Sequence, residues 1–129
     1  MVCASPYGAA YALETLAQLV GPGGTLPHAA FRVADGPQYK HRGLLVDIGR
    51  RYYPVPLLRD IIEAMSMSKM NVLHMHFSDF PAFRVQSLVY PSLTAALGDQ
   101  TYSQADIRSL IEFARLRGVR LVPEVDVPG

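Results

Sequence analysis

Short apolar runs end in polar residues at three places along the chain. The runs occupy residues 43–48, 72–77 and 119–125, and they are too short and too uniformly apolar for exposed helices. We therefore predict three strands, and we expect the first of them to be buried on both faces. The polar residues at or just after the ends of these runs are Asp47, Arg50, His74, His76, Asp79, Glu124 and Asp126.

Three other segments place apolar residues at helical spacing. The first covers residues 7–20 and stops at a glycine-rich turn, and the second covers residues 56–69. The third begins at Ser103, which forms a capping-box pattern with Asp106, and Gly118 stands where a helix C-cap belongs. We predict three amphipathic helices, of which the last two separate the three strands.

Two connections complete the chain. Residues 25–40 form a mixed connector, in which we predict a short strand over 29–34. Residues 78–101 form a long connection, in which we predict one turn of helix over 92–97. Connections of this length in compact domains usually have a function.

The order strand, helix, strand, helix, strand predicts parallel pairing, with the polar strand ends together at one edge of the sheet. An open nucleotide-binding sheet has a glycine-rich turn after its first strand, and residues 47–51 lack this pattern. The fold class is therefore α/β, and part of a (β/α) barrel fits best. About three strands leave sheet edges unpaired, so further barrel sequence is needed to complete the fold.

Composition narrows the function classes. The chain has 129 residues, of which half are hydrophobic and 18% are charged, and its formal net charge is +1. This is the composition of a globular domain, and no block of like charge attracts nucleic acid or anionic lipid. No apolar run is long enough to span a bilayer, and the first twenty residues make a poor signal peptide.

Three stretches of the chain carry a more specific signal. They are residues 41–50 (HRGLLVDIGR), 69–79 (KMNVLHMHFSD) and 112–129 (EFARLRGVRLVPEVDVPG). In order and spacing they resemble successive motifs of the β-N-acetylhexosaminidases of glycoside hydrolase family 20. The resemblance implies that residues 41–129 are the N-terminal part of a TIM-barrel catalytic domain, truncated here. It also implies that residues 1–40 end a preceding small α/β domain and connect it to the barrel.

The resemblance implies a reaction as well. The family removes terminal N-acetylglucosamine or N-acetylgalactosamine from glycoconjugates or chitin oligomers, without a cofactor. The acetamido carbonyl of the sugar attacks the anomeric carbon, a Glu protonates the leaving oxygen and a neighbouring Asp orients the acetamido group. That Asp-Glu pair belongs to a later strand, so we expect this chain alone to be inactive. By family resemblance the enzyme is lysosomal or secreted.

Arg50 is the first candidate for contact with the sugar. It matches the family arginine that holds the 3- and 4-hydroxyls of the terminal sugar, and a rigid fork of donors suits two adjacent hydroxyls. From the residues alone, an arginine paired with a carboxylate at a strand end is the favoured interpretation, and the resemblance shifts it towards sugar binding. Asp47 then either supports Arg50 or caps the loop, and we favour the supporting role.

Asp79 matches an acidic residue that pairs, in the family, with a histidine following a Pro-Gly sequence. In this chain that histidine is expected directly after Gly129. A carboxylate bonded to imidazole fixes its tautomer and raises its basicity, so we expect a supporting role for Asp79 in catalysis. The alternative is a solvated aspartate in a loop.

The remaining polar residues are expected to form a hydrogen-bonded network. His74 and His76 point to the same side of a strand, and so do Glu124 and Asp126. His-x-His at a barrel strand end is also typical of metal-dependent hydrolases, but two ligands are too few for a catalytic metal. We predict no metal and favour a polar network in the barrel, in which direct sugar contact by the two carboxylates stays open.

Two positions depart from the family pattern. Met75 stands where the family often has tryptophan, and Phe80 stands where it has a second acidic residue. The chain contains no tryptophan at all, although family sites stack the sugar on several. Two other classes of function stay open on other grounds. An incomplete barrel leaves room for a non-catalytic carbohydrate-binding or assembly fragment, and the His-x-His pattern leaves room for a metal-dependent barrel hydrolase.

Overall fold

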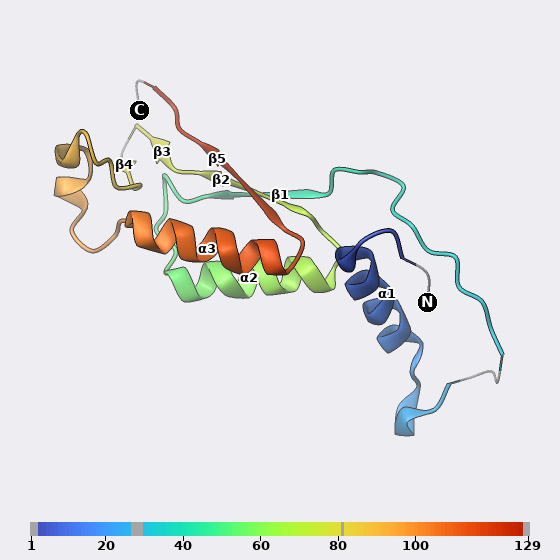
Figure 1. Ribbon diagram of the computed structural model, residues 1–129. Coiled ribbons are helices and arrows are strands. Elements are labelled where there is room, and N and C mark those ends of the chain that lie inside the picture. The colour runs from blue at the N-terminus through green and yellow to red at the C-terminus, as the bar shows by residue number, and fades with distance from the viewer. Residues whose placement is uncertain (1–2, 27–29, 81, 128–129) are drawn as a thin grey trace. The chain divides into compact units, whose positions relative to one another are not determined.

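The computed structural model describes residues 3–26, 30–80 and 82–127. The chain divides into two compact units, Met1–Lys40 and His41–Gly129. Figure 1 shows the order of their helices and strands. Within the described ranges, no helix has both the length and the apolar character needed to cross a membrane.

The first unit contains one α-helix, α1 (Pro6–Leu19), and a short 3₁₀ turn, η1 (Pro22–Gly24). The Ser5 side chain caps α1 by accepting a hydrogen bond from the backbone of Gly8, and the predicted helix is confirmed. No residue of α1 is buried. The short strand predicted over 29–34 is wrong for residues 30–34, which are irregular because no described neighbouring strand pairs with them; Ala29 lies outside the described residues.

The second unit is built on a sheet of three parallel strands. They are β1 (Gly43–Asp47), β2 (Val72–His76) and β5 (Arg120–Glu124), with β2 in the centre. The strand–helix–strand order and the parallel pairing predicted from the sequence are confirmed. The register places Asp47, His76 and Glu124 side by side at the carboxyl ends of the strands.

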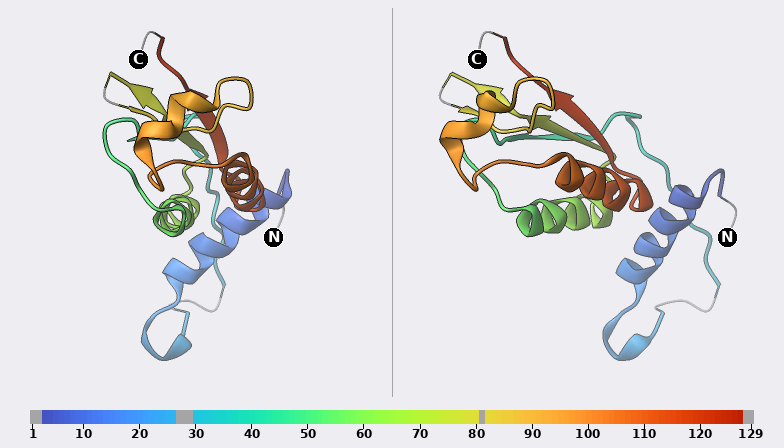
Figure 2. Two further views of the ribbon diagram at one scale, coloured as in Figure 1. Left: turned by 90° about the vertical axis from the view of Figure 1, so that its left-hand side faces the viewer. Right: turned by 60° about the vertical axis from the view of Figure 1, so that its left-hand side comes forward.

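Two helices cover one face of this sheet, α2 (Val55–Met67) and α3 (Gln104–Leu116) (Figures 1 and 2). Both were predicted, and the capping box between Ser103 and Asp106 is present with both of its hydrogen bonds. Gly118 ends α3 with a φ of 71°, a left-handed conformation that favours glycine.

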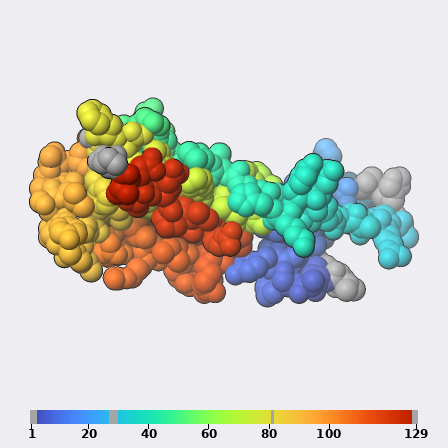
Figure 3. Space-filling view, turned by 90° about the horizontal axis from the view of Figure 1, so that it is seen from above, coloured from blue at the N-terminus to red at the C-terminus, as the bar shows by residue number. Residues whose placement is uncertain are grey.

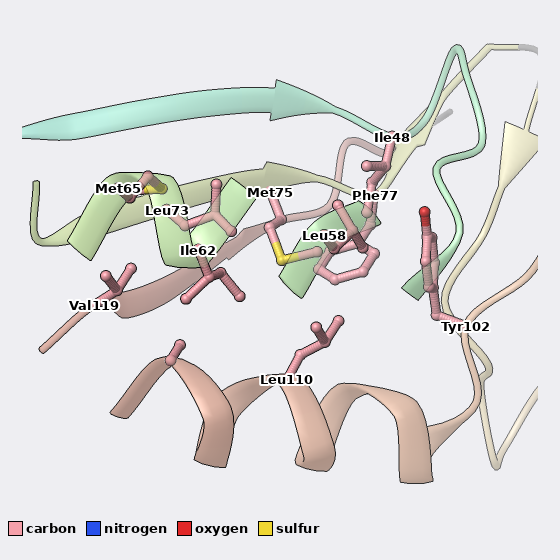
Figure 4. Close-up of a cluster of buried hydrophobic side chains, with 11 residues drawn as sticks. Ile48, Leu58, Ile62, Met65, Leu73, Met75, Phe77, Tyr102, Leu110 and Val119 are labelled. Atoms are coloured by element: carbon pink, nitrogen blue, oxygen red, sulfur yellow. The ribbon is translucent and has the colours of Figure 1, made fainter. Parts of the chain in front are cut away.

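The core lies between the sheet and these helices (Figure 4). Leu58 and Ile62 of α2 and Leu110 of α3 are fully buried against Leu73 and Met75 of β2. Burial of each large aliphatic side chain contributes about 1.5–3 kcal/mol to folding. This layer therefore fixes the strands whose ends carry the polar residues.

Among the described residues of the second unit, no helix covers the other face of the sheet, so β1 is not buried on both faces as predicted. Leu45 of β1 is 53% exposed, and the first three residues of the strand are all exposed. The sheet is seen from this side in Figure 3. The prediction was wrong because β1 is an edge strand of the described sheet and helices cover only one side of it.

The long connection between β2 and α3 is ordered by its own contacts. It begins with a small antiparallel hairpin of β3 (Ser78–Asp79) and β4 (Ala82–Phe83), which the sequence did not predict. The predicted helical turn over 92–97 lies inside a 3₁₀ helix, η2 (Pro91–Leu97). A parallel bridge between Val85 and Tyr102 then ties the two ends of the connection together.

Candidate active site

The polar residues predicted from the three apolar runs meet at the carboxyl edge of the sheet. Asp47, His76 and Glu124 are aligned by the strand register, and β3 continues directly from β2 to bring Asp79 to the same edge. In parallel α/β folds this is the edge at which ligands bind.

Arg50 forms ion pairs with two carboxylates at this edge. Its guanidinium donates to Asp47 Oδ2 at 2.6 Å, and its other terminal nitrogen pairs with Asp79. Its backbone N–H also donates to Asp47 Oδ1 at 3.0 Å. Asp47 therefore holds the side chain of Arg50 and caps the loop at the same time. The Arg50 side chain is still 64% exposed, so N–H donors remain available to a ligand.

These contacts shift two protonation equilibria. Burial by itself raises the pKa of Asp47, but the hydrogen bonds from the backbone and guanidinium of Arg50 outweigh it, and the pKa lies below its usual value. The hydrogen bond to Asp47 and the negative charge of Asp79 raise the pKa of Arg50. Both groups are therefore held in their charged forms.

Gly49 explains how the β1 loop brings Arg50 so close to Asp79. A Cβ at this position would lie 3.0 Å from the carbonyl carbon of Ser78 and 3.1 Å from the nitrogen of Asp79. The amide of Gly49 donates to the carbonyl of His76 at 2.8 Å. The loop thus packs directly on the backbone of β3, which only glycine permits without displacement.

His76 is the buried centre of the second group of contacts. It is 7% exposed, with Nε2 3.1 Å from Asp126 Oδ2 and Nδ1 3.6 Å from Asp47 Oδ1. The hydroxyl of Ser78 fixes the backbone of Asp126 by donating to its carbonyl and accepting from its amide. His76 therefore connects the ends of β1 and β5 through carboxylates.

His74 lies one step further from the strand ends, on the same side of β2. Its Nε2 is 2.5 Å from Glu124 Oε2. Both side chains are partly exposed on the sheet face that the helices do not cover. The structure thus brings all seven predicted polar residues to the same edge of the sheet. Five of them form one chain of contacts, and His74 and Glu124 form a separate pair beside it.

The two departures from the family pattern lie in different places. Met75 is 1% exposed and packs in the core below the sheet, on the side of the helices. Phe80 is 93% exposed beside Asp79, whose carboxylate accepts its backbone N–H at 2.6 Å. Phe80 therefore lies next to a residue of the polar edge, whereas Met75 points away from that edge.

Two groups of side chains have the proximity that a metal ion requires. They are Asp47, His76 and Asp79, and His76, Glu124 and Asp126. Both share His76, and in both the carboxylates already pair with Arg50 or with histidine. A cation would compete with these partners, so the donor set fits an internal polar network better than a resident metal.

Sequence reasoning missed two buried polar residues behind the edge, Arg84 and Tyr102. Arg84 is 6% exposed and donates to the carbonyls of Gly49 at 3.1 Å and Gln100 at 3.0 Å. Tyr102 is fully buried, and its hydroxyl donates to the carbonyl of Tyr53 at 2.7 Å. Their positions within a long polar-looking connection gave no periodic signal from which burial could be predicted.

Comparison with known proteins assigns the family. The profile described as "Glycosyl hydrolase family 20, catalytic domain" matches residues 39–129. The chain belongs to glycoside hydrolase family 20. It is 40% identical to a beta-hexosaminidase of Emericella nidulans and 40% identical to the beta-hexosaminidase subunit beta of Homo sapiens, in each case over 95% of this chain.

Solved structures agree with this assignment. A glycoside hydrolase family 20 beta-N-acetylglucosaminidase superposes with a TM-score of 0.85 and 32% identity, covering 98% of this chain and 28% of that one. The chitobiase of Flavobacterium johnsoniae gives a TM-score of 0.78 and 32% identity, covering 95% and 19%. The predicted fold class, a partial (β/α) barrel, is confirmed.

The match covers only part of each relative. The chain spans 21% of the Emericella nidulans protein and 23% of the human subunit. It therefore corresponds to a fragment of the relatives' length, as the three strands of the sheet also indicate.

Proposed function

We propose that this chain is the sugar-holding segment of a β-N-acetylhexosaminidase. The complete enzyme removes terminal N-acetylglucosamine or N-acetylgalactosamine from glycoconjugates or chitin oligomers by substrate-assisted, retaining catalysis. Residues 41–129 start its barrel, residues 1–40 end the preceding domain, and sequence beyond this segment completes both barrel and active site. By the same resemblance, the enzyme acts in the lysosome or outside the cell.

One observation carries this proposal: Arg50 is presented at the carboxyl edge while two carboxylates fix its position. Asp47 and Asp79 each pair with one terminal nitrogen, and most of the side chain still faces solvent. An arginine held in this way can donate to two adjacent sugar hydroxyls without losing much conformational freedom on binding. We assign Arg50 to the 3- and 4-hydroxyls of the terminal sugar.

The other residues of the edge support this group. Asp79 holds the guanidinium here, and in the complete enzyme we expect it also to orient a histidine from the segment that follows β5. His76 lies between Asp47 of β1 and Asp126 after β5, and His74 pairs with Glu124 of β5. We propose that these contacts fix the positions of the binding residues relative to one another. None of these residues is proposed as the general acid.

The test is Arg50→Lys in the complete enzyme that contains this segment. Lysine keeps the charge but loses the fork, so we expect kcat/KM on a nitrophenyl N-acetylglucosaminide to fall about 10- to 100-fold, with a raised KM. Arg51→Lys is the matched control, because Arg51 lies on the same loop and contacts the Tyr53 ring instead of the carboxylates. Equal kcat/KM for Arg50→Lys and the unsubstituted enzyme would refute the assignment.

A second assay tests the assignment of catalysis to the complete enzyme. The purified 129-residue chain should release no nitrophenol from the same substrate, because the general acid comes from another strand. If the activity that releases nitrophenol co-purifies with the chain, the general acid is present in these 129 residues. Amide hydrolysis that a chelator abolishes would instead support a metal-dependent hydrolase.

A further inference from the structure

We propose that Arg84 is a positioning residue for Arg50, and this inference rests on the sugar-binding role proposed above. Arg84 does not reach the polar edge itself. It acts on the backbone of the loop that carries Arg50, and its burial and hydrogen bonds are not explained by packing alone.

Burial of the Arg84 side chain has a cost in free energy. Arg84 is 6% exposed, and no carboxylate pairs with it among the residues that the structure describes. A buried guanidinium without a counter-charge is unfavourable unless backbone groups satisfy its donors. Arg84 meets this requirement with two carbonyls, those of Gly49 and Gln100. A methionine or leucine would fill the same space without that cost, so the two hydrogen bonds are what distinguishes arginine here.

One of the two hydrogen bonds of Arg84 lies next to Arg50 in the chain. Gly49 directly precedes Arg50, and its carbonyl belongs to the peptide bond that leads into Arg50. The backbone of Arg84 is itself held by two hydrogen bonds. Its amide donates to the carbonyl of Phe77 at 3.2 Å, and its carbonyl accepts from the backbone amide of Tyr102 at 2.7 Å. Arg84 thus connects the Arg50 loop, through its side chain, to the end of the central strand and to the long connection, which hold its backbone.

The loop that carries Arg50 is also held at its other end, at Tyr53. The Tyr102 hydroxyl accepts from the amide of Tyr53 at 3.2 Å and donates to its carbonyl at 2.7 Å. Residues 50–52 therefore lie between two anchors, Arg84 at Gly49 and Tyr102 at Tyr53. Without the first anchor, the backbone of Arg50 is restrained on that side by its own amide bond to Asp47 and by the amide bonds of Ile48 and Gly49 to His76.

The first experiment uses the 129-residue chain and is independent of its activity. In Arg84→Met, amide hydrogen exchange measured by NMR should accelerate about tenfold at Gly49 and Arg50, with no change at the core strand residue Leu73. Arg117→Met is the matched control, because Arg117 pairs with Glu63 of α2 and lies over the Phe113 ring of its own helix, with no contact to the loop among the described residues. Unchanged exchange at Gly49 and Arg50, or equal acceleration at Leu73, would overturn the proposal.

A conservative variant, Arg84→Lys, separates the loss of the guanidinium fork from unfolding of the chain. Arg84→Lys keeps a buried cation and a donor but cannot reproduce the fork, so the exchange rates at Gly49 and Arg50 should lie between those of arginine and methionine. Rates identical to those of the unsubstituted chain would show that the fork plays no part.

The second experiment is a double-mutant cycle in the complete enzyme. Arg84→Met should lower kcat/KM about tenfold, mainly through KM, in the presence of Arg50 and have no further effect in Arg50→Ala. An equal loss in both backgrounds would show a merely structural role. If the unsubstituted complete enzyme cleaves no N-acetylhexosaminide, the proposed function fails, whereas the exchange experiment still decides the role of Arg84 in the loop.

Discussion

Removal of one hydroxyl, in Tyr102→Phe, is expected to weaken the fold in a pH-dependent manner. This hydroxyl is fully buried and bonds to both the amide and the carbonyl of Tyr53. Phenylalanine fills the same space, so the loss consists of these two hydrogen bonds and leaves two backbone groups unsatisfied. We expect the free energy of unfolding at pH 8 to fall by about 1–3 kcal/mol.

The dependence on pH follows from the pKa of the same hydroxyl. Burial raises the pKa of Tyr102 from its usual 10.0 to about 12. Between these values the unfolded chain loses this proton before the folded chain does, so alkali favours unfolding. At pH 11 the difference amounts to about 1.4 kcal/mol. The stability advantage of the tyrosine chain over Tyr102→Phe should therefore shrink by this amount between pH 8 and pH 11.

Urea unfolding followed by far-UV circular dichroism, at several pH values from 8 to 11, measures this difference directly. The remaining tyrosines are present in both proteins, so subtraction of the two curves isolates Tyr102. A difference in unfolding free energy that stays constant over this range would refute the link between burial and ionisation. A variant as stable as the original chain at pH 8 would refute the importance of the hydrogen bonds to Tyr53.

Three further predictions concern the loop, the ion pair and the core. Gly49→Ala should lower the unfolding free energy by about 1–3 kcal/mol in urea, because its Cβ would press on the backbone of β3; equal stability would show that the loop can move aside. The folded-state pKa of Asp47 is lowered, so its carboxylate stabilises the fold above its unfolded pKa of about 4, and this stability is lost as the pH falls through the folded pKa. Asp47→Asn should therefore flatten the acid limb of a stability–pH curve, and an unchanged slope would contradict this. Leu110→Ala should cost about 2–5 kcal/mol by thermal or urea unfolding, whereas the half-exposed Ile111→Ala should change stability by only about 0.5 kcal/mol; similar losses would show that the core is misplaced.

The two helices and the three parallel strands of the second unit could be predicted because their signals are local, whereas the β3–β4 hairpin was not. The capping box at Ser103 and the left-handed Gly118 depend on contacts within a few residues, and both appear as the sequence indicated. The burial of β1 could not be predicted in the same way, because it depends on which elements cover each face of the sheet. A uniformly apolar strand indicates apolar surroundings without identifying what supplies them.

The candidate site shows the same division between local and distant contacts. The pairing of Asp47 with Arg50 spans three residues and was among the expectations, whereas that of Asp79 with Arg50 depends on the close approach of two loops at Gly49. Arg84 gave no signal at all, because its hydrogen bonds reach 35 and 16 residues along the chain. Burial of a charged residue is rare enough that sequence reasoning places it at the surface by default.

The function proposed above places a general acid from a later strand close to this edge, and the charge of the edge bears on the protonation of such an acid. Asp47, Asp79, Glu124 and Asp126 are four carboxylates, and Arg50 is the one permanently charged cation in contact with them among the described residues. A further carboxylic acid brought close to such an edge meets negative charge that disfavours its ionisation, so its pKa rises. A raised pKa is what a Glu needs if it is to remain protonated and donate to a leaving oxygen near neutral pH. Under the proposed function, the four carboxylates at this edge would therefore favour the protonated form of a glutamic acid brought there by a later strand.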